Sequence, residues 1–125
     1  MALQLATALV LALAATASAG SVPLTSDTFD AEVFGAGRPS FLLFYAPWCG
    51  HCKALKPAWN EMAAEYQAST SVLIAEVDCT AEEGLCEKHG VEGFPELKYA
   101  ESGASELEDF EGDDRSAEGL VRQHA

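Results

Sequence analysis

The sequence predicts an α/β fold in which a central mixed β-sheet is flanked by helices. Two hydrophobic runs, residues 41–46 and 72–78, have the composition of strands that are buried on both faces of a sheet. Each run is followed by a segment with helical periodicity, and the last third of the chain adds two strands and a helix. The predicted order of elements is therefore βαβαβαββα.

The first elements are short. Residues 22–24 are predicted to form an edge strand, a position that tolerates Pro23. Thr25 or Ser26 is expected to cap a helix over residues 27–34, and a turn rich in glycine then leads into the first hydrophobic run.

The middle of the chain is predicted to hold two helices. The first covers residues 49–66 and carries an apolar stripe, with a kink expected at Pro57 because proline removes a backbone donor. The second covers residues 81–89, and Gly90 ends it.

The C-terminal part is predicted to pair two strands and then form a helix. Residues 96–100 alternate in polarity as strand residues do, and the turn at Ser102 and Gly103 brings residues 105–111 back as an edge strand. The final helix is expected over residues 115–125.

Residues 1–19 have the features of a secretory signal peptide. They carry no charged side chain, their apolar core is too short to span a bilayer, and Ala17-Ser18-Ala19 has the small-residue pattern of a cleavage site. Cleavage is expected after Ala19, with an uncleaved anchor as the alternative. The remaining chain carries the whole formal net charge of −13, which argues against nucleic acid and anionic membranes as partners.

Residues 45–53 read Tyr-Ala-Pro-Trp-Cys-Gly-His-Cys-Lys and join a buried strand to the long helix. Cys49 is expected at the helix N-terminus, where free N–H groups and the helix dipole favour a thiolate. Cys52 follows one turn later on the same face and can form a disulfide with Cys49. The pattern predicts a redox-active dithiol whose potential Gly50 and His51 tune, since a protonated imidazole would stabilise the neighbouring thiolate.

The motif Trp-Cys-Gly-His-Cys-Lys resembles the active site of the protein disulfide isomerases, and the resemblance extends over about residues 22–121. It implies a thioredoxin fold for residues 20–125. It also implies that Cys49 attacks a substrate disulfide, that Cys52 resolves the mixed disulfide, and that no metal or organic cofactor is needed.

The resemblance also implies a substrate-binding surface. Phe94 and Pro95 correspond to the family's cis-proline segment, where the exposed backbone of Phe94 would bind an extended substrate. Trp48 would add apolar surface, and core packing is the alternative role of Phe94. Arg115 resembles the family's arginine that stabilises the second thiolate, although one extra residue precedes it and a surface ion pair is the alternative.

One position departs from the family. Where the family has a buried glutamate that accepts the proton of the second cysteine, this chain has Leu43, and where the family has the partner lysine it has Glu76. We therefore expect the acid to have moved to Glu76, which would be shielded from water, would lack a lysine partner and would shuttle a proton near pH 7. A solvated Glu76 at a strand edge is the alternative.

Cys79 and Cys86 are predicted to form a structural disulfide if Cys79 closes a strand and Cys86 lies in the next helix. Two free thiols are one alternative, and a zinc site built from these cysteines with Cys49 and Cys52 is another. The acidic residues between Glu106 and Asp114 are expected to form a solvated face, with weak calcium binding as the alternative.

The predicted function is a thiol–disulfide oxidoreductase and isomerase that acts on folding secretory polypeptides, with a substrate-binding holdase as the alternative. Its expected partners are unfolded clients and glutathione or a partner oxidoreductase, and the expected state is a monomer. Four cysteines after a signal peptide predict an oxidising compartment, the lumen of the endoplasmic reticulum. Secretion is an alternative because the chain ends at Ala125 without a retention signal, and the chain can also be one domain of a longer isomerase.

Overall fold

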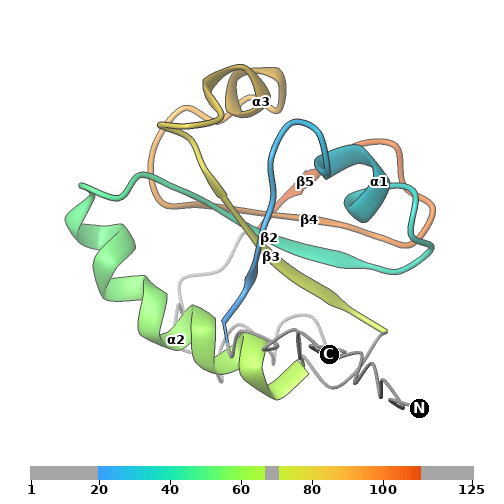
Figure 1. Cartoon of the computed structure of the whole chain (residues 1–125), viewed down its shortest axis with the longest axis horizontal. Helices are drawn as coiled ribbons and strands as arrows, with labels where there is room; N and C mark the ends of the chain where they lie inside the picture. The colour runs from blue at the N-terminus through green and yellow to red at the C-terminus, as the bar shows by residue number, and fades with distance from the viewer. Residues whose placement is uncertain (1–19, 67–70, 111–125) are drawn as a thin grey trace, which may run out of the picture.

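The computed structural model describes residues 20–66 and 71–110, which form a five-stranded sheet with three helices (Figure 1). The strands pair in the order β1-β3-β2-β4-β5. Strands β1, β3 and β2 are parallel to one another, β4 is antiparallel to β2, and β5 is antiparallel to β4. The elements are β1 (Val22–Pro23), α1 (Phe29–Val33), β2 (Ser40–Tyr45), α2 (Gly50–Tyr66), β3 (Leu73–Asp78), α3 (Glu83–Lys88), β4 (Glu96–Ala100) and β5 (Glu108–Asp109).

The sheet separates two hydrophobic layers, and the alternation of side chains along β2 shows how. Leu42 and Phe44 pack with residues of α1 and α3 on one face. Phe41 and Leu43 pack with residues of α2 on the other face, where the fully buried Trp59 lies 5.0 Å from the ring of Phe41. Because β2 is covered on both faces, it is hydrophobic at every one of these positions, as the sequence predicted. Helix α2 lies on one side of the sheet and helices α1 and α3 on the other (Figure 1).

The central elements lie within a residue or two of their predicted bounds, and the main departures are at α1 and β5. The expected cap at Thr25 or Ser26 is wrong, because Thr28 stands at the N-terminus of α1. The amide of Thr25 instead bonds to the hydroxyl of Thr28 at 3.0 Å, and the carbonyl of Thr25 accepts from the amide of Phe29 at 2.9 Å. These bonds form a turn ahead of the helix, which shortens the helix.

Strand β5 is shorter than the predicted range of 105–111. The turn at Gly103, whose φ of 80° suits glycine, continues through a longer connection, so only Glu108 and Asp109 pair with β4. The predicted helix over 115–125 lies outside the described residues. Across 20–66 and 71–110, no helix is long and apolar enough to cross a membrane.

Candidate dithiol active site

Cys49 lies at the end of the loop that joins β2 to α2, one residue before the helix begins. Its amide donates to the carbonyl of Ala46 at 3.0 Å, and its own carbonyl accepts from the amide of Lys53 at 3.1 Å, the first turn of helical bonding. This position leaves the amide groups of the first turn free to face the sulfur of Cys49, as expected for a helix N-terminus.

The sulfur of Cys49 is held between two backbone groups. The amide of Cys52 points to it at 3.4 Å, and the thiol of Cys49 lies 3.6 Å from the carbonyl oxygen of Phe94. The hydrogen bonds from the thiol and then the amide of Cys52 are the main causes that lower the pKa of Cys49; burial opposes them, and the amide of His51 adds the smallest lowering. Cys49 is therefore suited to be the attacking thiolate.

Cys52 has the opposite character. It is only 1% exposed, and burial is the main cause that raises its pKa to about 11; the hydrogen bond with Cys49 adds to this rise. The positive charge of Lys56 acts in the other direction. The two thiols thus differ in both access and acidity, and this difference suits the outer sulfur to attack and requires the inner one to lose its proton before it can react.

The residues between the two cysteines are open to solvent. Gly50 begins α2 and has no atom within 4 Å of the place where a side chain would start. His51 is exposed, and the contribution that the structure gives it is the bond from its backbone amide to Cys49. The tuning role of the His51 imidazole stays a prediction.

Trp48, Phe94 and Pro95 lie together beside the reactive sulfur. The peptide bond between Phe94 and Pro95 is cis, and it presents the Phe94 carbonyl to Cys49. Trp48 is 69% exposed, and its ring meets the ring of Phe94 edge to face with the centroids 5.9 Å apart. Phe94 is half-buried and also packs on the core, so surface and core contacts coexist. An aromatic pair with one exposed ring beside the dithiol offers apolar surface to a substrate chain.

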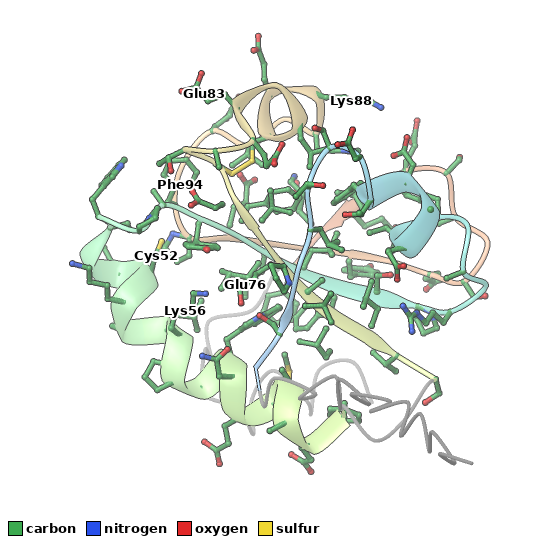
Figure 2. All side chains as sticks on the ribbon, in the orientation of Figure 1. Cys52, Lys56, Glu76, Glu83, Lys88 and Phe94 are labelled. Atoms are coloured by element: carbon green, nitrogen blue, oxygen red, sulfur yellow. A yellow bond between two sulfur atoms is a disulfide. The ribbon has the colours of Figure 1, made fainter. Side chains whose placement is uncertain are left out.

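A small polar network lies beneath the dithiol. Lys56 of α2 forms an ion pair with the carboxylate of Glu76 on β3, and the hydroxyl of Ser21 donates to the same carboxylate. The side chains of Lys56 and Glu76 lie between α2 and β3, close to Cys52 (Figure 2). The amine of Lys56 also lies 4.1 Å from the centroid of the Tyr45 ring.

Tyr45 belongs to the same network. Burial, followed by the negative charges of Glu76 and Asp78 and a hydrogen bond to Glu76, raises the pKa of its phenol to about 12. The Tyr45 hydroxyl therefore stays protonated at physiological pH and donates to the Glu76 carboxylate. The charge of a Cys52 thiolate also acts on Tyr45, which places the network within electrostatic range of the second cysteine.

The expectation that Glu76 lacks a lysine partner is wrong. The side chain of Glu76 is only 12% exposed, as expected of a shielded position, but Lys56 neutralises its charge. The alternative of a strand-edge residue is also wrong, because β3 lies between β1 and β2, where Glu76 pairs with Pro23 and Leu43. Lys56 was missed because a partner was sought only on the neighbouring strand.

Two sequence signals would have located Lys56. It follows Cys52 by four residues, which places both on one face of α2. Glu76 is two residues from Ile74, and alternation along a strand directs both toward the same face, the one that α2 covers.

Cys79 and Cys86 are joined by a disulfide with a Cα–Cα distance of 5.7 Å. The bond connects the end of β3 to α3, and it removes two of the four thiols that a zinc site would need. Within the described part of the chain, no group of three histidine, cysteine or acidic side chains is placed to hold a metal ion. Arg115 lies outside the described residues.

Comparison with known proteins places this fold and site in a family. Residues 20–124 match the family model described as thioredoxin. A protein disulfide-isomerase-like protein of Emiliania huxleyi, EhSep2, is 48% identical over 104 residues, which cover 82% of this chain and 47% of that protein. Protein disulfide isomerase-like 2-1 of Oryza sativa is 45% identical over 107 residues, 85% of this chain and 29% of that protein.

Solved structures of related domains have the same fold. The J-Trx1 fragment of ERdj5 superposes with a TM-score of 0.71 at 35% identity, covering 82% of this chain and 48% of the fragment. The first thioredoxin domain of mouse protein disulfide-isomerase A4 gives 0.71 at 30% identity, covering 84% of this chain and 73% of that domain.

The chain belongs to the thioredoxin family, and the predicted thioredoxin fold is confirmed. Within that family its thioredoxin domain is of the protein disulfide isomerase type, and the Cys49–Cys52 pair is consistent with a Cys-x-x-Cys active site. The chain spans less than half the length of the curated relatives named here.

Proposed function

We propose that the protein is a thiol–disulfide oxidoreductase and isomerase that forms and rearranges disulfides in folding secretory polypeptides. The observation that supports this proposal is the difference between the two thiols. The pKa of Cys49, at the N-terminus of α2, is lowered, whereas Cys52 is buried and its pKa is raised. Such an asymmetry separates an attacking from a resolving sulfur.

The exchange proceeds in two balanced steps. The Cys49 thiolate attacks one sulfur of a client disulfide, forms a mixed disulfide and releases the other client sulfur as a thiolate. Cys52 then loses its proton and attacks the sulfur of Cys49, which releases the second client thiolate and leaves the Cys49–Cys52 disulfide. The client has gained two electrons. The reverse sequence oxidises a client dithiol. In isomerisation, a different client thiolate attacks the client sulfur of the mixed disulfide, which forms a new client disulfide and releases the Cys49 thiolate.

The Lys56–Glu76 pair is proposed to handle the proton of Cys52. At neutral pH, a thiol with a pKa near 11 reacts only if another group accepts its proton. The Glu76 carboxylate, which is largely shielded from solvent, is the acid of this network. Lys56 acts as a positioning residue, because its charge both favours the Cys52 thiolate and holds Glu76 in place. In this arrangement the lysine comes from helix α2, whereas the resemblance to the family implied a lysine on the adjacent strand.

Refolding of scrambled ribonuclease tests the activity. The wild-type chain is expected to restore ribonuclease activity in a glutathione buffer, and the variant with both Cys49→Ser and Cys52→Ser is expected to restore none above the buffer rate. Equal recovery with both proteins would reject the enzymatic proposal.

A holdase is the second candidate, favoured by the exposed Trp48 beside Phe94. In that case the double serine variant would suppress aggregation of a reduced client as well as the wild type does, while neither protein would speed refolding.

The same chemistry indicates which clients, redox partners and cellular compartment to expect. We propose unfolded polypeptides as clients and glutathione or a partner oxidoreductase as the electron source or sink, in a monomer of the secretory pathway. Relatives named as protein disulfide isomerases support this setting, and so does a Cys79–Cys86 disulfide, which is typical of an oxidising compartment. Mass spectrometry of the protein purified from eukaryotic cells, expected to begin at Gly20, tests the signal peptide.

A further inference from the structure

A groove opens beside the dithiol. Its volume is about 610 Å³, within the range of pockets that bind ligands. Trp48 and Phe94 line it next to the reactive sulfur, and its lining continues over Val91 and the Cys79–Cys86 disulfide to helix α3. The groove therefore combines apolar surface with a position next to the dithiol, since Phe94 both lines it and contacts Cys49.

Three glutamates also line this groove: Glu83, Glu87 and Glu92. All three are exposed, and none forms an ion pair with any residue in the ranges 20–66 and 71–110. Glu83 and Glu87 are one turn apart on α3, a spacing at which like charges repel and destabilise a helix. Glu83 is in the first turn, where the helix dipole favours a carboxylate, whereas the repulsion means that Glu87 does not serve the stability of α3.

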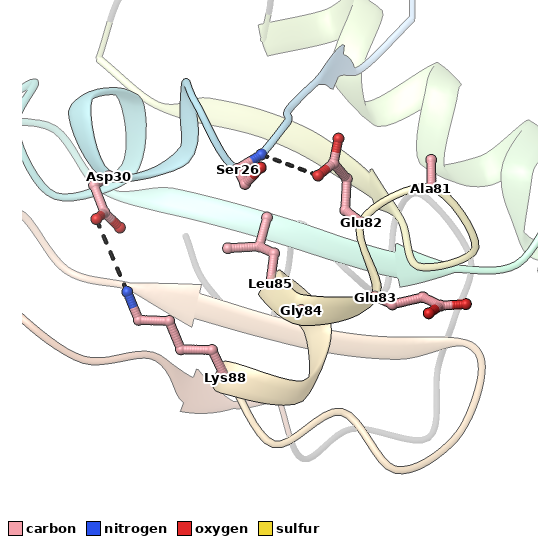
Figure 3. Close-up of a pocket in the computed structure, with 8 residues that line it drawn as sticks. All are labelled: Ser26, Asp30, Ala81, Glu82, Glu83, Gly84, Leu85 and Lys88. Carbon is pink, nitrogen blue, oxygen red and sulfur yellow. Dashed lines mark hydrogen bonds and ion pairs between the residues drawn. The ribbon is translucent and has the colours of Figure 1, made fainter.

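The other side of α3 is different. There Lys88 lies 4.0 Å from Asp30, and the amide of Ser26 donates to Glu82 at 3.2 Å (Figure 3). Glu83 extends away from these pairs (Figure 3). On the side that faces α1, Asp30 thus has a cation nearby and Glu82 has a backbone donor, whereas the three glutamates of the groove have no ion pair in the described ranges; Glu83 borders both sides.

We propose that the groove binds the part of a client next to its reactive cysteine and favours lysine or arginine there. The inference rests on the proposed function and names its preferred substrate class. Apolar client side chains cover Trp48 and Phe94 while a client cation faces the glutamates. An extended chain advances about 3.3 Å per residue, so cations placed two and four residues from the cysteine sample about 7 and 13 Å along the groove.

The test separates binding from catalysis by using the full chain with Cys49→Ser and Cys52→Ser. Three nine-residue peptides share an apolar sequence with a central serine in place of cysteine, and carry lysine, glutamine or glutamate two and four residues to either side. Binding is measured by NMR titration at low salt and at 0.5 M salt. In the same background, a groove variant (Glu83→Gln, Glu87→Gln, Glu92→Gln) is compared with a control variant of equal charge change (Glu61→Gln, Glu65→Gln, Glu101→Gln).

The lysine peptide is expected to bind about fivefold more tightly than the glutamine peptide, and the glutamate peptide more weakly than both. Screening by 0.5 M salt should reduce this preference. The groove variant should lose most of the preference and the control variant should keep it. A preference below twofold, or an equal loss in both variants, overturns the inference. Because this measurement needs no reactive thiol, its result is independent of the ribonuclease assay.

Discussion

Lys56 and Glu76 form an ion pair that links the helix carrying the dithiol to the middle strand of the parallel half of the sheet. The pair is largely shielded, with Glu76 12% and Lys56 27% exposed, and Ser21 and Tyr45 complete its hydrogen bonding. A charge pair of this kind contributes little net stability compared with apolar residues, but removing one partner leaves the other uncompensated. We therefore propose that the pair serves the chemistry of Cys52 rather than folding.

The first prediction concerns this pair. Glu76→Gln should slow disulfide exchange about tenfold or more at pH 7, because the buried Cys52 thiol loses its proton acceptor. The loss should shrink as the pH rises toward 9, where solvent removes the proton directly. Rates are measured by stopped exchange and mass analysis of the mixed disulfide, which should accumulate in the variant.

Lys56→Met should produce the same pH-dependent defect, whereas Lys53→Met, one residue after Cys52, is the matched control and should not. A rate profile of either Glu76→Gln or Lys56→Met that is parallel to the wild type at every pH would discard the relay and leave the dithiol assignment intact.

A second prediction concerns the two thiols. Iodoacetamide should modify Cys49 far faster than Cys52 in the reduced protein, because Cys49 has the lowered pKa and Cys52 has a raised pKa near 11 and is buried. The pH midpoint for Cys49 should lie below that of an ordinary thiol, which peptide mapping of the alkylated protein measures. Equal labelling of the two cysteines at pH 7 would contradict this assignment.

The Cys79–Cys86 disulfide carries a third prediction. Cross-linking so short a loop should stabilise the fold by about 2.5 kcal/mol through the entropy of the unfolded chain. Replacing both cysteines with serine should lower the urea midpoint, followed by circular dichroism, without abolishing alkylation of Cys49. An unchanged midpoint would mean that the bond contributes nothing to stability.

A fourth prediction concerns His89, whose ring lies 4.8 Å from that of Phe29. Burial, with a smaller effect of Lys88, lowers the pKa of His89, so the unfolded chain binds this proton more readily than the folded one. The contribution of neutral His89 to the free energy of unfolding is therefore fully present above about pH 6.5 and decreases as the pH falls below that value. Urea unfolding between pH 7.5 and 5.5 should show a decline that His89→Gln reduces. Parallel curves for the two proteins would rule it out.

Much of the fold could be predicted from local pattern. The hydrophobic runs that became β2 and β3 needed only the rule that doubly covered strands are apolar throughout, and Gly90, with a φ of 71°, marked the end of α3. The short elements were less predictable. Hydrogen bonds of side chains and turns decided the start of α1 and the length of β5, and such bonds compete with regular structure in ways that periodicity does not record.

The residues of the site also differ in how well contiguous sequence predicts them. Cys49 and Cys52 could be located because their spacing and helix position are features of contiguous sequence. Lys56 could not be assigned as the partner of Glu76 by comparing strands, since the ion pair crosses from a helix to the sheet. The groove could not be predicted from sequence either, because its lining residues come from the loop before α2, from the region of α3 and from the segment before β4.

The two tryptophans have contrasting surroundings: Trp59 is buried on the face of α2 that packs on the sheet, and Trp48 is exposed to solvent beside the dithiol. The chain thus contains two built-in optical probes. Emission from Trp48 should respond to oxidation of the neighbouring sulfurs and to client contact, while that of Trp59 should change only when the core opens. Two variants, Trp48→Phe and Trp59→Phe, would let redox turnover and unfolding be followed separately without any added label.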